Sequence, residues 1–283
     1  MSEKNYGESC LTKLDLDYMH LVDEIINEGI VCENRTGVDT IAISGSMIKH
    51  DMSIGFPLLT IKKVLFGVMA TELEGFIKGI SDKKWYQDRG CNIWDKWHNP
   101  KTNDENDLGK IYGYQWNNFG GVNQLAKLID DVKNNPNSRR IIVSAWNPSD
   151  LGEMALPPCH VLYQVNRIGD KLDLVWYQRS VDVPLGLPFN IASYALLLEL
   201  ICNVTGNIPG KVIGMLSNCH IYEDQLDPIK NKLIPQAKKS SITTLPKLVI
   251  KRKLDSIYDF DASKDVEIVG YEHQPFVKIP VTA

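Results

Sequence analysis

The sequence predicts an α+β protein that forms a single domain over residues 1–283. Its length fits one large domain or two small ones, and neither an internal repeat nor a low-complexity linker divides it. Apolar residues make up 43% of the chain and charged residues 23%, the balance of a globular protein with a full core. Helical and strand-like segments do not alternate strictly, and there is no glycine-rich phosphate loop, which argues against a doubly wound nucleotide fold.

Several segments carry apolar residues at the spacing of a helix. The first ends at Gly29, the second at Gly79, and the last just before Gly206, because glycine commonly ends helices. The last segment is apolar on nearly every face and therefore belongs at the centre of the fold. The predicted helices cover residues 14–29, 64–79, 122–134 and 190–204.

Alternation of apolar and polar residues predicts the strands. Residues 40–52 alternate like a strand pair bent at Gly45, and residues 168–170 form a hairpin turn between two later strands. The polar stretch 98–110 is rich in turn-forming residues and predicts a surface loop. The other predicted strands cover residues 141–147, 160–167, 171–181, 247–253 and 266–272.

Charge and cysteine content limit the classes of partner. The net charge of −4 provides no basic field for nucleic acid, which is not expected as a partner. The six cysteines form no CxxC pair and none has zinc-type spacing, so we expect no metal and a reducing compartment. The polar N-terminus is unlike a signal peptide, and the longest apolar stretch, 191–201, is too short to span a bilayer. We expect a cytosolic protein.

Several motifs carry a resemblance to a known family. SRRIIVSAWNP, MALPPCH, YQRSVDVPLGLPFNIASYA and CHIY follow one another in the order and spacing of thymidylate synthases. Upstream, ENRTG, GFPLLTIKK, TELEGF, CNIWDKW and IYGYQW also resemble that family, so the similarity covers nearly the whole chain. The resemblance implies a mixed sheet packed by helices, with a sheet face forming a dimer interface.

Cys159 is the candidate nucleophile. A lone cysteine is more often a small core residue, but Cys159 follows Pro157 and Pro158, a rigid approach without backbone donors. The uracil ring is a Michael acceptor at C6, where a thiolate can add, and this addition makes C5 nucleophilic. The resemblance implies this role for Cys159 and implies that Arg179 stabilises the thiolate.

Arginines are the candidate phosphate ligands, because bidentate guanidinium contacts hold a doubly charged phosphate strongly. Without the resemblance, Arg35, Arg139 and Arg140 would be read as solvated surface charges. The resemblance implies that Arg35, Arg179 and Ser180 bind phosphate from one subunit. It implies that Arg139 and Arg140 reach the site of the other subunit, and hence an obligate homodimer with shared sites.

The base and the sugar have their own candidate residues. The Asn190 carboxamide offers a donor and an acceptor that match O4 and N3–H of uracil, although asparagine also suits a helix N-cap. Relatives that act on deoxycytidylate carry aspartate at this place. The resemblance implies that Gln178 also binds the nucleotide and that His220 and Tyr222 bond the 3′-hydroxyl; otherwise these two would be ordinary core polar groups.

The resemblance implies further residues for proton transfer and for the folate. A carboxyl group near apolar walls has a raised pKa, which suits Glu72 to order water and assist proton transfers at O4 and C5. Tyr112 is implied in removal of the C5 proton and Asp182 in a hydrogen bond to the pterin. The implied catalytic residues are Cys159, Glu72, Tyr112, Arg179, Asp182 and Asn190. The implied folate-binding residues are Lys62, Trp94, Trp97, Asp182, Gly186 and Ala283, with the tail PVTA folding over the site to exclude water.

Three stretches depart from the family pattern. ELEGF, with Glu74 and Gly75, stands where the family usually has ELLWF. Leu65 and Gly67 replace a histidine and an arginine, and residues 217–219 replace the glycine-aspartate before HIY. The first two departures are expected near the folate, whereas the nucleotide-side residues are intact.

The resemblance implies reductive methylation of deoxyuridylate to thymidylate. 5,10-Methylenetetrahydrofolate would supply both the carbon and the hydride and leave as dihydrofolate, with no metal. A deoxyuridylate hydroxymethylase shares every nucleotide contact and adds water in place of hydride, so the sequence keeps that alternative open. A catalytically idle relative that binds nucleotide or RNA is disfavoured, because the catalytic residues are present and no basic face with exposed aromatics is evident.

Overall fold

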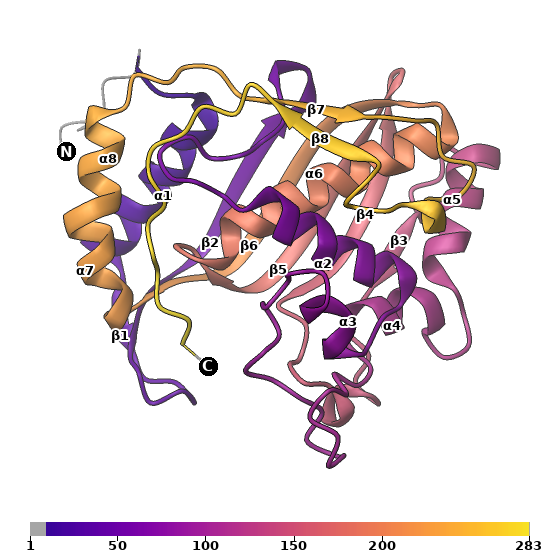
Figure 1. Ribbon diagram of the computed structural model, residues 1–283, viewed down its shortest axis with the longest axis horizontal. Coiled ribbons are helices and arrows are strands. Elements are labelled where there is room, and N and C mark those ends of the chain that lie inside the picture. The colour runs from indigo at the N-terminus through magenta and orange to yellow at the C-terminus, as the bar shows by residue number, and fades with distance from the viewer. Residues whose placement is uncertain (1–9, 283) are drawn as a thin grey trace.

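The computed structural model describes residues 10–282 and centres on a six-stranded sheet (Figure 1). The strands lie in the order β1-β2-β6-β5-β4-β3. β5 and β6 run parallel and the other neighbouring pairs antiparallel, so the sheet is mixed. The strands are β1 (Ile30–Cys32), β2 (Thr40–Asp51), β3 (Ile142–Ser144), β4 (His160–Ile168), β5 (Lys171–Asp182) and β6 (Ile208–Tyr222). The predicted α+β class with a mixed sheet packed by helices is confirmed.

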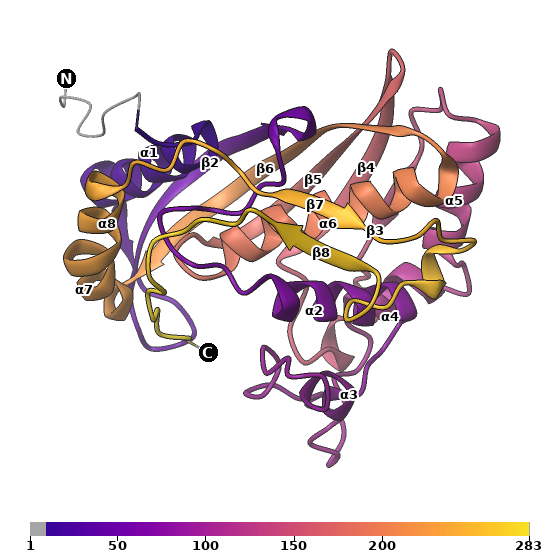
Figure 2. The same cartoon turned by 45° about the horizontal axis from the view of Figure 1, so that its top comes forward.

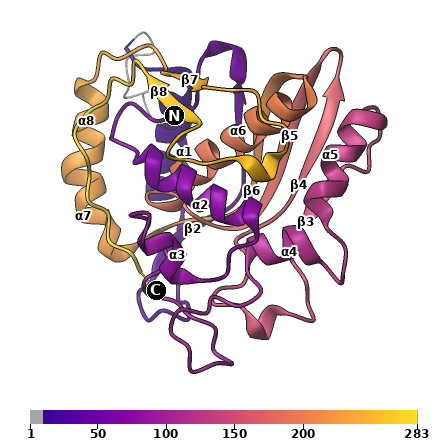
Figure 3. The same cartoon turned by 45° about the vertical axis from the view of Figure 1, so that its right-hand side comes forward.

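Helices cover one face of this sheet (Figures 2 and 3). The long helix α6 packs directly on β5 and β6, and α2 packs on α6. The helices are α1 (Lys13–Glu28), α2 (Phe66–Lys78), α3 (Lys83–Gln87), α4 (Tyr112–Asn118), α5 (Gln124–Asn134), α6 (Gly186–Thr205), α7 (Leu226–Pro228) and α8 (Ile234–Lys239), with a π-helical turn at Ile229–Leu233. β7 (Lys247–Ile250) and β8 (Val266–Val269) form a separate antiparallel pair.

Side-chain and glycine caps set several helix ends. The Thr12 hydroxyl accepts a hydrogen bond from the backbone N–H of Asp15 and starts α1. The Asn123 side chain accepts one from the N–H of Ala126, so α5 begins at Gln124 instead of the predicted 122. Gly79 ends α2 in the left-handed conformation, with φ of +71°. The predicted helices at the first three positions are therefore confirmed within a few residues.

Helix α6 begins four residues before the predicted start. Gly186 and Pro188 suggest a loop in the sequence, but the N–H groups of the first turn have no intrahelical acceptor, so proline is tolerated there. Asn190 thus lies one turn inside the helix, and its interpretation as an N-cap is wrong. α6 is long and apolar enough to cross a membrane, but 72% of that stretch is buried inside the protein.

Four predicted strands differ from the observed ones. Those at 247–253 and 266–272 each end three residues early, at Ile250 and Val269. Residues 40–51 form one strand instead of a bent pair, because both halves pair with β6 in a single register on either side of Gly45. Gly45 has a φ of +79° and interrupts the pairing locally. β3 covers only three residues, because the chain turns away before Trp146.

No strand was predicted from the sequence over residues 208–222, where the central strand β6 lies. It is 15 residues long and joins β2 on one side to β5 on the other. Because it ends at Tyr222 beside the end of β5, it brings the HIY motif next to Asp182; His220 and Asp182 are partners in the register. β1, α3, α4, α7 and α8 were also missed.

Candidate active site

Two adjoining cavities lie at the end of the sheet where β5 and β6 finish. One, here called the polar cavity, has a volume of about 600 Å³ and includes Arg35, Arg179, His220 and Tyr222 in its wall. The other, here called the aromatic cavity, has a volume of about 500 Å³ and includes Trp94, Tyr112, Phe189 and Glu72. Both are lined by Trp97, Leu156, Cys159, Ser180, Asp182, Leu185 and Val281.

Cys159 lies on the shared wall, immediately before β4. Its backbone N–H donates to the Tyr112 hydroxyl at 2.8 Å, and its carbonyl accepts from the N–H of Arg179 at 2.8 Å. The Arg179 guanidinium donates to the carbonyls of Pro157 and Pro158 at 2.9 and 2.8 Å. Pro157 and Pro158 are thereby fixed to β5. The half-buried thiol of Cys159 faces both cavities. Burial raises the pKa of Cys159, and the positive charge of Arg179 opposes that rise.

The polar cavity gathers most of the residues predicted for the nucleotide. Arg35 comes from the exposed loop after β1, Ser180 from β5, and His220 and Tyr222 from β6. His220 Nδ1 lies 2.8 Å from Asn218 Oδ1, which orients the ring, and burial lowers the pKa of His220. The imidazole is therefore neutral near pH 7 and suited to a hydrogen bond with a hydroxyl.

Arg139 and Arg140 lie elsewhere. They precede β3 at the sheet edge, are exposed, and line neither cavity. A single chain therefore does not bring these two arginines to Cys159.

Asn190 and Gln178 form a pair in the aromatic cavity. Gln178 Nε2 donates to Asn190 Oδ1 at 3.0 Å, and Gln178 Oε1 accepts from the Trp176 indole at 3.1 Å. The indole has only a donor, so it fixes which end of the Gln178 amide faces Asn190. Asn190 Nδ2 is consequently left to donate, and Oδ1 keeps a lone pair to accept.

Glu72 is buried in α2 at the wall of the aromatic cavity. Burial raises the pKa of its carboxyl to about 7. The indole N–H of Trp94 lies near the carboxyl and opposes this rise, but Trp94 Nε1 makes no hydrogen bond among residues 10–282, so burial dominates. Glu72 can therefore both take and give a proton near neutral pH.

Tyr112 is held by stacking. Its ring lies parallel to that of His160, with centroids 4.0 Å apart, and His160 Nδ1 lies 2.8 Å from the Tyr194 hydroxyl. Burial lowers the pKa of His160 to about 3, so that ring stays neutral. Burial also raises the pKa of Tyr112 well above its usual value, so its hydroxyl stays protonated.

Asp182 ends β5 between the cavities. Its carboxylate accepts from Leu185 N–H at 3.0 Å and from Gln225 Nε2 at 3.1 Å. Burial raises the pKa of Asp182 to about 6, against the lowering effect of these bonds and of Lys62. Lys62 is buried behind this site, donates to the Pro184 carbonyl at 2.5 Å, and lines neither cavity. Burial lowers the pKa of Lys62 to about 8.

The remaining folate-side residues fall into two groups. Trp94, Trp97 and Gly186 line the aromatic cavity. Ala283 lies outside the described residues, but Val281 of the same tail lines both cavities. The tail predicted to cover the site therefore reaches it.

Comparison with known proteins identifies the family. The family model "Thymidylate synthase" matches residues 16–283. The chain belongs to the thymidylate synthase family. It is 43% identical to a thymidylate synthase of Mycoplasma genitalium, over 92% of this chain and 97% of that relative. The resemblance seen in the motifs is thus confirmed, and with it an enzyme that transfers a methyl group.

The ELEGF departure from the thymidylate synthase pattern has a structural explanation. A side chain at Gly75 would meet the Tyr86 ring, because a Cβ there would lie 2.2 Å from a ring carbon. Tyr86 is fully buried and thus fills the space that the usual tryptophan would need. Glu74 pairs with Lys78 at 2.6 Å and accepts from the N–H of Ala262 at 2.9 Å, so its charge is matched inside the core.

Sequence reasoning missed three residues that support the thymidylate synthase site. His160 stacks on Tyr112, Trp146 lies 5.2 Å beneath the Arg179 guanidinium, and Gln225 bonds Asp182. His160 and Trp146 stand inside the quoted motifs MALPPCH and SRRIIVSAWNP, which could have drawn attention to them. Gln225 stands three residues after Tyr222 and had no motif of its own.

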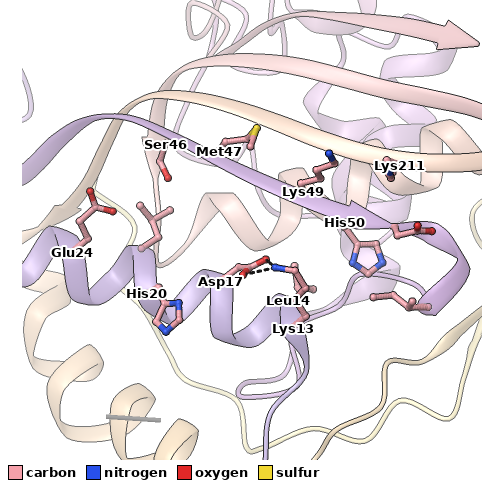
Figure 4. Close-up of a pocket in the computed structure, with 13 residues that line it drawn as sticks. Lys13, Leu14, Asp17, His20, Glu24, Ser46, Met47, Lys49, His50 and Lys211 are labelled. Carbon is pink, nitrogen blue, oxygen red and sulfur yellow. Dashed lines mark hydrogen bonds and ion pairs between the residues drawn. The ribbon is translucent and has the colours of Figure 1, made fainter. Parts of the chain in front are cut away.

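Another cavity lies between α1 and β2, and Cys159 is not among the residues that line it (Figure 4). Its wall mixes opposite charges, and its Lys13 and Asp17 already pair with one another at 2.6 Å. It contains none of the described residues predicted for thymidylate synthase chemistry. Within residues 10–282, no group of three or more His, Cys, Asp or Glu is placed to hold a metal ion.

Proposed function

We propose that the chain converts deoxyuridylate to thymidylate, with 5,10-methylenetetrahydrofolate as the donor of carbon and hydride and dihydrofolate as the second product. The observation that carries this proposal is the position of Cys159 on the wall shared by a polar cavity with arginines and an aromatic cavity. A nucleophile at that wall can attack a nucleotide whose phosphate and sugar lie in the polar cavity and whose base reaches Asn190 in the aromatic cavity, where the folate would also bind.

Phosphate and sugar would bind in the polar cavity. Arg35 and Arg179 supply guanidinium donors for phosphate, and the Ser180 hydroxyl can add a hydrogen bond. Arg179 stays close to Cys159 because its own bonds to the proline carbonyls hold it there. Neutral His220 and the Tyr222 hydroxyl would meet the 3′-hydroxyl of the deoxyribose.

Uracil would be read by Asn190. Because Gln178 fixes the carboxamide, Nδ2 would donate to O4 and Oδ1 would accept from N3–H. The Cys159 thiolate then forms a bond to C6, and the displaced electron pair makes C5 an enolate carbon. Glu72, whose pKa of about 7 lets it carry a proton at neutral pH, would support the charge on O4 through ordered water.

The aromatic cavity fits a folate. Trp94, Trp97 and Phe189 offer flat apolar walls, and the buried Asp182 carboxyl can bond a pterin N–H. Bound there, the folate supplies the one-carbon unit and the hydride.

The C5 proton would pass through the Tyr112 hydroxyl and ordered water to the ionised Glu72 carboxylate. Loss of this proton would expel tetrahydrofolate from the one-carbon unit and leave a methylene on C5. Hydride from the same folate would reduce that methylene, and the electron pair returned to the ring would break the bond from C6 to Cys159 and release the thiolate.

Water exclusion favours hydride over water in the last step. Trp94 is buried at 4% exposure, and Val281 of the tail lines both cavities. Lys96 Nζ donates to the Val281 carbonyl at 2.8 Å, which holds the tail end over the site. A closed, dry cavity protects a reactive carbon from hydration.

The uncovered sheet face supports a homodimer. Met47, Met215 and Tyr177 are cross-strand partners on β2, β6 and β5, and they are 57%, 44% and 41% exposed. Such a continuous apolar row marks a protein interface. Pairing of two copies on this face would let Arg139 and Arg140 of each copy reach the other's polar cavity, which lacks them.

The compartment is proposed to be the cytosol. The free thiols of Cys91, Cys159, Cys202 and Cys219 are consistent with its reducing conditions.

The test is product identity. The purified protein is incubated with deoxyuridylate and 5,10-methylenetetrahydrofolate, dihydrofolate is followed by absorbance, and the nucleotide is identified by mass. Thymidylate and dihydrofolate in equal amounts are expected. Hydroxymethyldeoxyuridylate without dihydrofolate would contradict the proposal and show that water reaches the site.

A further inference from the structure

Gln225 is a fully buried side chain that joins three segments around the proposed folate site. It lies in a short turn just after β6. Its Nε2 donates to Asp182 Oδ2 at 3.1 Å and to the Pro280 carbonyl at 3.2 Å. Its Oε1 accepts from the backbone N–H of Tyr222 at 3.1 Å. One amide therefore bonds the end of β5, the end of β6 and the C-terminal tail.

These contacts fix the orientation of the amide. A glutamine amide has two N–H donors and one oxygen, and all three are used here. If the amide turned over, Oε1 would face the Asp182 carboxylate and the Pro280 carbonyl, which are both acceptors. Because buried acceptors placed against one another are costly, the amide has one stable orientation.

The other bonds of the tail end are more exposed. Lys96 and Asp224 are exposed where they bond Val281 and Thr282, so water competes with these contacts. The bond from fully buried Gln225 to half-buried Pro280 is the least exposed of these, and it ends one residue before Val281 enters the wall of both cavities. Tail position is therefore linked to Asp182 through a single side chain.

We propose that Gln225 is a positioning residue that couples docking of the C-terminal tail to the orientation of Asp182. When the tail is docked, the Gln225 amide holds Asp182 in the geometry that meets a pterin. When the tail leaves, Gln225 loses one of its acceptors and Asp182 loses a fixed partner. The proposal deepens the proposed function, because it rests on Asp182 as a folate ligand.

Gln236 provides a matched control. Its Nε2 also donates to two carbonyls, those of Ile61 and Pro275, at 3.0 and 3.1 Å. It therefore ties an earlier part of the same tail without touching Asp182. Gln225→Leu and Gln236→Leu each remove one hydrogen bond that the amide donates to the tail and one that it donates to another segment, but only the first breaks the link to Asp182.

The first readout is the effect on the two substrates. Gln225→Leu should raise KM for the folate by about tenfold or more, as expected for loss of a hydrogen bond to a charged group. Deoxyuridylate binding without folate should stay within about twofold, and Gln236→Leu should change neither by more than about threefold. Equal effects of the two variants on folate KM would overturn the proposal.

The second readout is non-additivity with removal of residues 280–283. Coupling predicts that truncation costs the wild type and Gln236→Leu much more in kcat/KM than it costs Gln225→Leu, which has already lost the link. If truncation lowers kcat/KM by the same factor in Gln225→Leu as in the wild type, the two changes act independently and coupling is contradicted.

A third readout does not depend on turnover, because coupling is reciprocal. Asp182→Ala and Gln225→Leu should both speed carboxypeptidase release of Thr282 and Val281 by about tenfold relative to Gln236→Leu. Unchanged release in Asp182→Ala would refute the link. If release behaves as expected but the wild type makes no thymidylate, the proposed function fails and the coupling stands.

Discussion

At the scale of single residues, the burial of Glu72 is expected to make the stability of the protein depend on pH. The pKa of Glu72 rises from 4.5 to about 7, so between these values the folded protein holds a proton that the unfolded chain has lost. The stability that this group contributes is complete below pH 4.5 and is lost as the pH rises to about 7. At about 1.4 kcal/mol per pH unit, the total change is about 3 kcal/mol.

Glu72→Gln removes this dependence. Relative to the wild type, the variant should become more stable by about 2–3 kcal/mol when the pH is raised from 5 to 8. Denaturant unfolding at both pH values and one protein concentration measures the change, with Glu105→Gln in the exposed loop as the control. A stability difference that does not vary with pH would refute the assignment. Turnover should also fall about 100-fold or more, because proton transfer is impaired.

Asn190 sets the choice of base in this account. Asn190→Asp keeps the hydrogen bond from Gln178, since a carboxylate oxygen accepts it equally well, so the fold should survive. A protonated aspartate presents the pattern that matches cytosine, and the ratio of kcat/KM for deoxycytidylate over deoxyuridylate should rise by at least about tenfold. Exposed Asn134→Asp serves as the control. An unchanged ratio would show that another group reads the base.

Residues inside the motifs were predictable from the sequence, but their partners were not. Cys159, Ser180 and Asp182 meet on one wall as expected. The bond from Gln225 to Asp182 spans 43 positions of the chain, and the bond to Pro280 spans 55. Local spacing carries no information on such contacts, because they depend on how β5, β6 and the tail pack.

At the scale of elements, α2 and α3 fit together at Gly75. Gly75→Ala should destabilise the protein by about 1–3 kcal/mol, because its Cβ would overlap the buried Tyr86 ring. Gly67→Ala in the same helix meets nothing within 4 Å and should be neutral or stabilise by up to about 1 kcal/mol. Denaturant unfolding measures the free energy of unfolding of both variants and of the wild type. A Gly75→Ala variant as stable as Gly67→Ala would contradict the packing described.

β6 shows why an element can escape sequence analysis. Gly210 and Gly214 weaken its strand pattern, yet both make room for a neighbour on β5. A Cβ at Gly214 would lie 2.4 Å from the Trp176 ring, and one at Gly210 would lie 2.2 Å from Asp173 Oδ1. Glycine is needed at these two positions because side chains of β5 come close to the β6 backbone. Those side chains belong to another strand, so the local sequence of β6 does not reveal the reason for the glycines. Helices such as α1, whose pattern and caps are local, were predicted well.

At the scale of the whole molecule, the proposed function predicts an active site built from two chains. Arg139 and Arg140 are the candidate residues that a single chain leaves away from Cys159, while the apolar row on β2, β6 and β5 offers a surface for a second copy. The sequence implied this arrangement through the family resemblance alone, because charge and periodicity do not distinguish a shared residue from an exposed one.

Mixing two inactive variants tests the shared site. Cys159→Ser supplies intact arginines, and Arg139→Ala with Arg140→Ala supplies an intact thiol. After unfolding and refolding together at equal amounts, half of the dimers would be mixed, each with one complete site of two, giving about a quarter of wild-type activity. Each variant refolded alone is the control. Activity no higher than the sum of the controls would contradict sites built from two chains.

The central claim is that Cys159 attacks a nucleotide whose binding does not depend on the thiolate. The most direct measurement compares turnover and deoxyuridylate affinity in Cys159→Ser and the wild type. We expect thymidylate formation to be abolished while the dissociation constant for deoxyuridylate stays within about threefold, since only the covalent step needs the thiolate. Substantial residual turnover, or loss of nucleotide binding in a folded variant, would contradict it.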